Sequence, residues 1–154
     1  MTVGVALLSG CGGAQKRPFV CRPSRGHGVV QPFNGRLTAL GRRPVYVRID
    51  NAGDLGRGIV MLATTSFPGW FALKTHFFAV GDYRGPVHVT VRRLDRSGVA
   101  RLGDSPNGGD SLSAPASPDL LWFTWVRSPG CYEWRISGRT FHEAVIVRAT
   151  PHRR

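Results

Sequence analysis

The hydrophobic pattern of the chain consists mainly of short alternating segments. The clearest covers residues 86–92, where Val87, Val89 and Val91 alternate with polar neighbours after a Gly-Pro pair. A period of two places successive side chains on opposite faces of a β-strand. The pattern therefore predicts a strand with the valines facing the core and the polar residues facing solvent.

Six further segments show strand patterns, and none shows a long helical period. Alternation, or apolar runs rich in β-branched and aromatic residues, marks residues 44–50, 59–65, 71–78, 120–126, 131–137 and 141–149. The last two are joined by a short turn, which predicts a hairpin. Strands at this spacing favour an antiparallel β-sandwich. Residues 103–118 are rich in Gly, Ser and Pro, and we expect them to form an exposed polar loop.

Composition narrows the classes of partner. The 154 residues suit one domain, and the formal charge of +12 would ordinarily favour an anionic partner. However, nearly all the cations are arginines dispersed along the chain, with lysine at positions 16 and 74 alone, a bias expected of a GC-rich coding sequence as much as of selection for phosphate. Nucleic acid is therefore not the favoured partner, whereas weak attraction to an anionic envelope polymer or lipid headgroup is retained.

The N-terminus carries a candidate lipidation site at Cys11. An apolar run, residues 3–8, leads into Leu-Ser-Gly-Cys, which resembles the lipobox of bacterial lipoprotein signals. This resemblance implies cleavage before Cys11, diacylglycerol on its sulfur and a flexible tether after it. The run is shorter than the roughly 7 to 15 apolar residues of a signal peptide and no basic segment precedes it. A translation start further upstream and an ordinary buried cysteine are the alternatives.

The three cysteines, Cys11, Cys21 and Cys131, bear on the compartment. Lipidation of Cys11 would leave Cys21 and Cys131 as an even pair, which an exported chain can keep oxidised. Two free buried thiols are the alternative. No CxxC, HxH or HExxH spacing occurs around the cysteines or histidines, so we predict neither a metal site nor a cofactor.

One tetrapeptide imitates a catalytic motif. Residues 109–112 spell the Gly-Asp-Ser-Leu nucleophile block of a hydrolase family, but that block belongs near the start of an α/β domain. Neither His142 nor His152 has the aspartate three residues earlier that would complete the triad. The spacing of His27, His76 and His88 indicates no shared site either. We therefore predict no catalytic residue.

Aromatic residues give the candidate binding positions. Residues 120–125 carry large apolar groups on both faces of the predicted strand, so either the strand is central or a loop or partner covers Phe123 and Trp125. Core packing is the favoured interpretation. The alternative is a sugar-stacking or peptide-binding platform built from Trp70, Trp125 and Arg127.

Several blocks of the chain resemble a family of small uncharacterised bacterial exported proteins. Members carry a strand ending in Arg-Arg-Leu-Asp, a later Gly-Cys-aromatic block and a final apolar strand. Many begin with a lipoprotein signal and have an early cysteine in the place of Cys21. The corresponding blocks are residues 83–87, 92–95, 129–134, 137–138 and 145–148. The resemblance implies an immunoglobulin-like β-sandwich, supports pairing of Cys21 with Cys131, and implies no activity.

These observations predict four segments. Residues 1–10 form a lipoprotein signal segment, 11–26 a tether and N-terminal extension, 27–150 an all-β, immunoglobulin-like antiparallel sandwich, and 151–154 a basic tail. We expect an extracytoplasmic, membrane-anchored protein of the bacterial cell envelope that acts as a non-enzymatic binding or structural module. A small hydrolase with an unrecognised site and a cationic protein that binds an anionic polymer are the alternatives. The expected partners are the membrane, through the lipid, and an envelope protein or anionic polymer.

Overall fold

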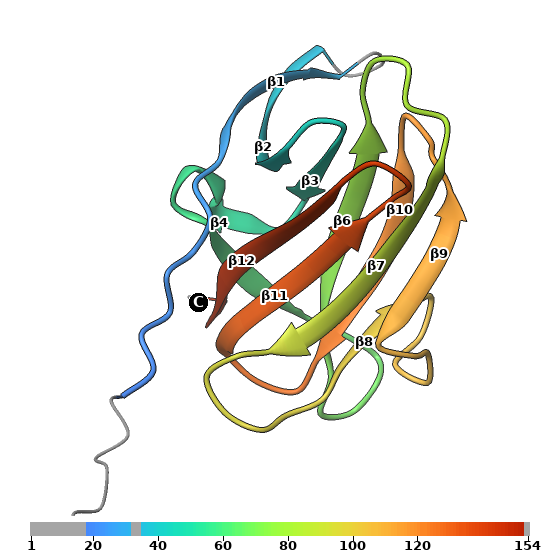
Figure 1. Ribbon diagram of the computed structural model, residues 1–154. Coiled ribbons are helices and arrows are strands. Elements are labelled where there is room, and N and C mark those ends of the chain that lie inside the picture. The colour runs from blue at the N-terminus through green and yellow to red at the C-terminus, as the bar shows by residue number, and fades with distance from the viewer. Residues whose placement is uncertain (1–17, 32–34, 153–154) are drawn as a thin grey trace, which may run out of the picture.

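The computed structural model describes residues 18–31 and 35–152, so Cys11 and the expected signal segment lie outside it (Figure 1). The described residues form twelve strands, one 3₁₀ turn and no α-helix. In chain order the elements are β1 (His27–Gln31), β2 (Gly35–Arg42), β3 (Val45–Ile49), β4 (Ala52–Asp54), η1 (Leu55–Arg57), β5 (Ile59–Thr64), β6 (Phe71–Ala79), β7 (Pro86–Arg93), β8 (Ala100–Gly103), β9 (Ser111–Pro115), β10 (Leu120–Val126), β11 (Gly130–Ser137) and β12 (His142–Pro151).

The strands form one mixed sheet that curls so that its two halves face each other. The hydrogen-bonded order is β1-β2-β3-β6-β5-β12-β11-β7-β9, with β10 joining β6 to β8 and β4 pairing with β5. Strand β5 belongs to both halves, because it runs parallel to β12 and then pairs antiparallel with the start of β6. The all-β prediction is confirmed. The expectation of purely antiparallel pairing is wrong at β5 and β12, where Ile59 lies opposite Arg148 in a parallel ladder.

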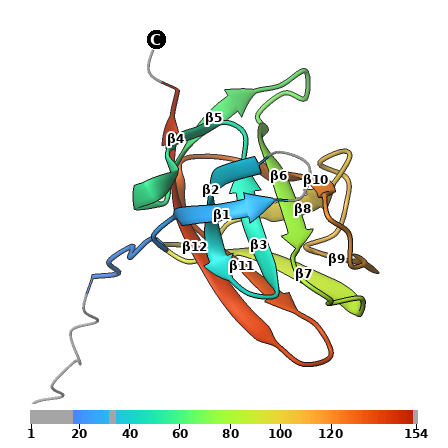
Figure 2. The same ribbon diagram turned by 90° about the horizontal axis from the view of Figure 1, so that it is seen from above.

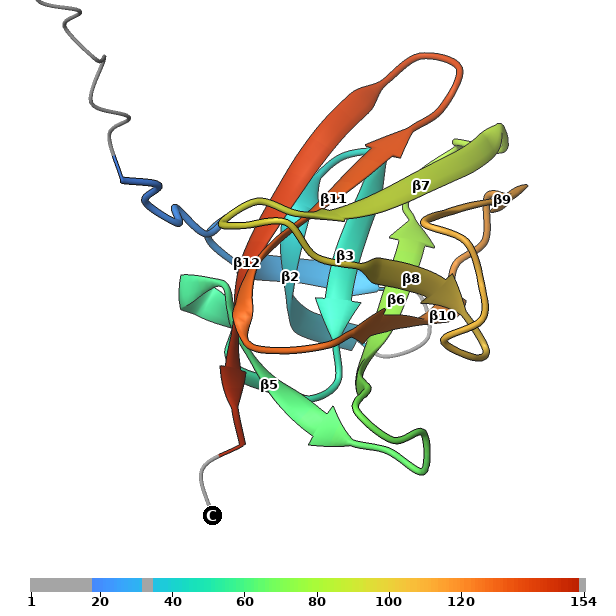
Figure 3. The same ribbon diagram turned by 90° about the horizontal axis from the view of Figure 1, so that it is seen from below.

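The core lies between the two halves. Viewed from above and below, β7, β11 and β12 form one wall and β3, β6 and β10 the other (Figure 2, Figure 3). Val87, Val89 and Val91 are buried, as their alternation predicted. Trp134 is fully buried, and its indole nitrogen donates to the Thr124 hydroxyl of the opposite wall at 3.0 Å. This bond satisfies a buried donor and fixes how the two halves pack.

The segment expected to be a polar loop contains a strand. Residues 103–118 include β9, which pairs with β7 from Pro86 opposite Pro115 to Thr90 opposite Ser111. Within β9, Leu112 packs against the core while the flanking serines are exposed. An edge strand with two half-buried apolar positions, Leu112 and Ala114, does not need the apolar content that marked the other strands. For that reason the composition of this segment concealed it.

Residues 21–26 are hydrogen-bonded to the edge of β12 at Ile146, and β5 pairs with the same edge from Arg148 onward. The Ser24 amide donates to the Ile146 carbonyl at 2.8 Å, and the Ile146 amide donates to the Ser24 hydroxyl at 2.9 Å. The Gly26 amide donates to the Gly56 carbonyl at 3.1 Å. The N-terminal extension is thus part of the folded body from Cys21 onward, and it covers a length of β12 that would otherwise be an open edge.

Candidate functional site

The loop between β5 and β6 brings the predicted binding residues together. The Arg127 guanidinium lies over the Trp70 ring, 4.1 Å from its centroid, an arrangement favourable for a cation–π interaction. Trp125 is only 5% exposed, because the Phe67 ring packs edge-on against it at 5.1 Å. Its indole nitrogen donates to the Gly103 carbonyl at 2.8 Å. Arg127 is thus exposed and Trp70 half-buried, whereas Trp125 is covered by Phe67 and is not part of the exposed surface.

The two explanations for the apolar residues 120–125 each hold in part. Strand β10 is central in its half of the sheet, since it pairs with β6 on one side and β8 on the other. Its inward face includes Trp122, which packs on the core. Its outward face includes Trp125, which the β5–β6 loop covers through Phe67. The sequence could not assign the two faces, because both carry large apolar groups.

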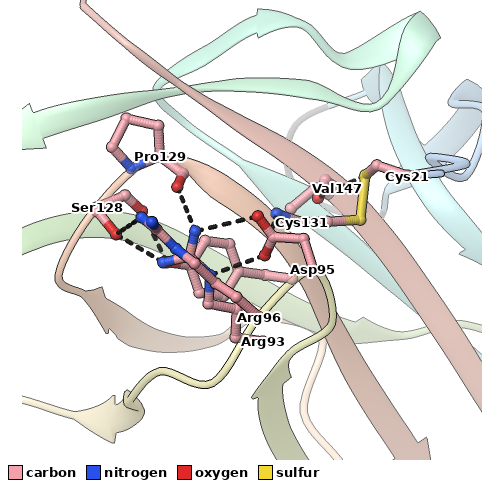
Figure 4. A network of polar contacts seen from close by, with 9 residues as sticks. Cys21, Arg93, Asp95, Arg96, Ser128, Pro129, Cys131 and Val147 are labelled. Atoms are coloured by element: carbon pink, nitrogen blue, oxygen red, sulfur yellow. Dashed lines mark hydrogen bonds and ion pairs between the residues drawn. A yellow bond between two sulfur atoms is a disulfide. The ribbon is translucent and has the colours of Figure 1, made fainter. Parts of the chain in front are cut away.

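Cys21 and Cys131 form a disulfide with a Cα–Cα distance of 5.8 Å across 110 residues of chain (Figure 4). The bond ties the N-terminal extension to the start of β11. On the extension side, the Arg148 guanidinium also donates to the Cys21 carbonyl at 3.2 Å. The disulfide indicates a non-reducing, extracytoplasmic setting.

Beside the disulfide, the nearly buried Arg93 side chain forms an ion pair with the partly exposed Asp95 (Figure 4). The Arg93 Nε and Nη2 atoms donate to the two Asp95 carboxylate oxygens at 2.7 and 3.1 Å. Arg93 also donates to the Ser128 hydroxyl and the Pro129 carbonyl, each at 2.6 Å. The Asp95 carboxylate in turn accepts the Cys131 amide at 3.2 Å. The hydrogen bond from Arg93 lowers the pKa of Asp95 below its ordinary value.

This Arg93 network is a structural lock rather than a ligand site. A fifth contact, to the Tyr132 hydroxyl at 3.3 Å, engages the last of the five guanidinium donors. At Gly130 an added Cβ would lie 2.4 Å from Arg93 Nη2, so glycine is required for the guanidinium to reach this position. The Arg-Arg-Leu-Asp and Pro-Gly-Cys-Tyr blocks of the sequence thus meet here, and they join the end of β7 to the start of β11.

His76 is the centre of a polar cluster on the outer face of β6 that sequence reasoning missed. Its Nδ1 lies 2.7 Å from an Asp119 oxygen and its Nε2 lies 3.1 Å from an Asp50 oxygen. Asp50 also pairs with Lys74 at 2.8 Å and with Arg48 at 2.9 Å. Burial acts to raise the pKa of Asp50, but the hydrogen bonds from Lys74 and His76 outweigh it and lower the pKa below its ordinary value. The cluster links β3, β6 and the segment before β10.

Two further strand histidines, His88 and His142, lie on β7 and β12 in the other wall. His88 and His142 flank Ser137 in adjacent strands, and the His88 Nδ1 atom lies 2.6 Å from the Ser113 hydroxyl. Next to them, a cavity of about 510 Å³ includes Glu133 and Arg135. Burial acts to raise the pKa of Glu133, but hydrogen bonds from Arg92 and Arg135 lower it. The serine of the tetrapeptide at residues 109–112 lies opposite Thr90, two pairs away from His88.

No group of three or more His, Cys, Asp or Glu side chains in residues 18–31 and 35–152 is arranged to hold a metal ion. Over the same ranges, no helix is long and apolar enough to cross a membrane. Comparison with known proteins finds neither a family model nor a curated protein that matches the chain.

Proposed function

We propose that this chain is an exported bacterial envelope protein, held at the membrane by a lipid on Cys11, and that it acts as a non-enzymatic binding or structural module. The observation that carries the proposal is the Cys21–Cys131 disulfide. It uses two of the three cysteines, and the remaining one directly follows the Leu-Ser-Gly of the lipobox-like segment. Disulfide and lipobox therefore favour the same oxidising compartment.

The position of the disulfide suits a tethered protein. Cys21 follows Cys11 by ten residues, which span at most about 36 Å when fully extended. The disulfide then passes any tension on the tether directly to β11, a central strand of its wall, rather than to the Ser24–Ile146 edge contacts alone. The folded body would stay near the membrane without being loosened by its anchor.

An immunoglobulin-like sandwich is the architecture we propose for the curled sheet. The Tyr132 hydroxyl donates to the Ser128 carbonyl, four residues upstream, at 2.7 Å. This bond at the turn from β10 to β11 is similar to the tyrosine corner of immunoglobulin-like domains. The resemblance of the Gly-Cys-aromatic block to small exported proteins supports the same proposal. On such a scaffold, the Trp70–Arg127 pair is the candidate binding position.

The anchor is tested by replacing its attachment atom. In the native host, we expect the wild-type protein to fractionate with membranes, and intact-mass measurement to give a chain that starts at Cys11 with added acyl mass. Cys11→Ser should abolish the acyl mass and leave a protein that a high-salt wash releases from the membranes, because a serine hydroxyl does not replace the thiol in lipid transfer. The melting temperature should stay unchanged, since Cys11 is not part of the disulfide.

Ser9→Ala is the matched control, because alanine keeps a small residue at that position of the lipobox-like segment. It should leave lipidation intact. A chain that keeps Met1 and carries no acyl group, or a Cys11→Ser variant that resists a high-salt wash as well as the wild type does, would contradict the proposed anchor.

A further inference from the structure

Exposed apolar side chains gather at the end of the molecule from which the N-terminal extension leaves. Of the six large apolar side chains exposed among the described residues, four lie here: Phe19, Val20, Phe67 and Val99, at 49%, 64%, 37% and 43% exposure. They come from the extension, the β5–β6 loop and the β7–β8 loop, which Figure 1 shows toward the bottom of the molecule. The other two, Val30 and Leu121, lie toward the opposite end, in β1 and at the start of β10.

The turn from β10 to β11 connects these groups into one surface. Val126, at the end of β10, pairs with Ala100 on one side and Phe71 on the other. The next residue, Arg127, therefore lies beside Val99 and Trp70, which precede those two partners in the chain. On the other side of the turn, Phe19 and Val20 line a hollow of about 530 Å³ together with Pro129. We call this the tether-end surface. It consists of Phe19, Val20, Phe67, Trp70, Arg96, Val99, Arg127, Pro129 and Arg148.

The cations of the tether-end surface are exposed and stand next to its apolar groups. Arg127 lies over Trp70, Arg96 donates to the Ser128 hydroxyl at 3.1 Å, and Arg148 lines the hollow that Phe19 and Val20 also line. The carboxylate of Asp95, which also lines that hollow, is already engaged by Arg93. The surface therefore presents aromatic and aliphatic side chains among positive charges.

We propose that the tether-end surface lies on the anionic lipid headgroups of the leaflet that holds the Cys11 lipid. The headgroup region favours this combination, because aromatic side chains partition into it and arginines pair with lipid phosphates. Pro18, where the described chain begins, follows Cys11 by seven residues, at most about 25 Å. The anchor would thus keep the surface at a high local concentration next to the leaflet. The proposal rests on the proposed function and adds an orientation, in which β1 and the His76 cluster point away from the membrane.

The test uses the full chain with Cys11→Ser, so that no lipid contributes to binding. We expect it to co-sediment with vesicles of phosphatidylcholine containing one quarter phosphatidylglycerol, and to bind pure phosphatidylcholine vesicles much more weakly. Arg127→Glu should weaken the partition coefficient about tenfold and Val99→Ser about threefold. Both side chains are exposed, so circular dichroism should be unchanged and the melting temperature should fall by no more than the few degrees expected from loss of the Arg127–Trp70 contact.

Matched controls separate a local surface from the net charge of +12. Arg36→Glu makes the same charge change in β2, and Val30→Ser makes the same apolar change in β1; both positions are exposed at the other end of the molecule. We expect each to bind vesicles within about twofold of the parent. An Arg36→Glu variant as weak as Arg127→Glu would overturn the proposal in favour of diffuse attraction.

Two further outcomes bear on the proposal independently of the anchor. The first outcome uses polyphosphate at the same phosphate concentration as the vesicles. If polyphosphate binds the chain as well as anionic vesicles do, and Val99→Ser weakens binding to neither, the partner is a soluble anionic polymer and the proposal is wrong. If the unlipidated chain binds anionic vesicles as expected while the native protein proves to lack an acyl group, the surface stands and the Cys11 anchor is the part that fails. If the native protein is lipidated but its Cys11→Ser form does not bind anionic vesicles, the Cys11 anchor stands and the proposed membrane-binding surface is wrong.

Discussion

Removing the Cys21–Cys131 disulfide is expected to lower the free energy of unfolding by about 4 to 5 kcal/mol. In the chain-entropy model, a cross-link that closes a loop of roughly a hundred residues restricts the unfolded chain by about that amount. Here 110 residues separate the two cysteines. Domains of this size are typically stable by about 5 to 15 kcal/mol, so the loss is a large part of the total. Urea unfolding of the Cys21→Ser/Cys131→Ser double variant against the wild type measures it.

The comparison needs both redox conditions. Under a reducing agent, the wild type should unfold at the same urea concentration as the double variant, and Cys11→Ser should match the wild type in either condition. The extension should also become easier to cleave by protease, because Ser24 and Arg148 would then hold it without the covalent bond. Equal stability of the double variant and the oxidised wild type would show that the disulfide does not limit the unfolded chain.

The strands that could be predicted are those in which apolar and polar residues alternate because one face is buried and the other is exposed. In β7 the valines alternate with polar residues, and in β11 Tyr132, Trp134 and Ile136 face the core while Arg135 is exposed. In these strands local periodicity and tertiary burial agree except at Glu133, which is buried on the polar face of β11 and pairs there with Arg92 and Arg135. The same cannot be said of β1, β2, β4, β8 and β9, which the sequence analysis did not identify. They are short, lie at the ends of the sheet order, or carry few apolar residues.

The local sequence pattern could not predict that β5 and β12 pair in parallel. Alternation indicates which face of a strand is buried, and that face is the same whether the neighbouring strand runs parallel or antiparallel. The pattern therefore cannot distinguish the two kinds of pairing. The pairing of Ile59 with Arg148 depends instead on how β5 leaves the η1 turn at Gly58. At Gly58 φ is +65°, and an added Cβ would lie 2.4 Å from the Ser24 carbonyl oxygen. The residue from which β5 starts is therefore in close contact with the N-terminal extension, which a local pattern could not indicate.

For the candidate site, the sequence supplied residues but not contacts. It indicated Trp70, Trp125 and Arg127 as candidates. It could not indicate that Phe67 covers Trp125, because this contact forms only when the β5–β6 loop folds back over β10. The histidine spacing gave no sign that His76 would lie between Asp50 and Asp119, because these residues come from three separate segments. The Arg-Arg-Leu-Asp block and the Gly-Cys-aromatic block were visible, but their contact joins positions 36 residues apart.

That contact gives the second large effect: Asp95→Ala is expected to destabilise the protein by about 2 to 4 kcal/mol. Removing one partner of a buried ion pair typically costs about 3 to 5 kcal/mol, because the other charge stays buried without compensation. The Arg93 side chain is 4% exposed and the Asp95 side chain 30%, so the expected loss lies somewhat below that range. The Cys131 amide would lose its acceptor as well. Chemical denaturation at pH 7 measures the change.

The pH dependence distinguishes loss of the charge from loss of packing. Because Arg93 lowers the pKa of Asp95 in the folded protein, the ion pair contributes stability above the ordinary aspartate pKa, and this contribution is lost as the pH falls through the lower folded value. The wild type should therefore lose stability below about pH 4, and Asp95→Asn, which keeps the shape of the side chain, should lose less over the same interval. Asp104→Asn, at an exposed aspartate outside the network, should follow the wild type. If Asp95→Asn retained the full acid sensitivity and the stability of the wild type at pH 7, the Arg93–Asp95 pair would not be the lock between β7 and β11.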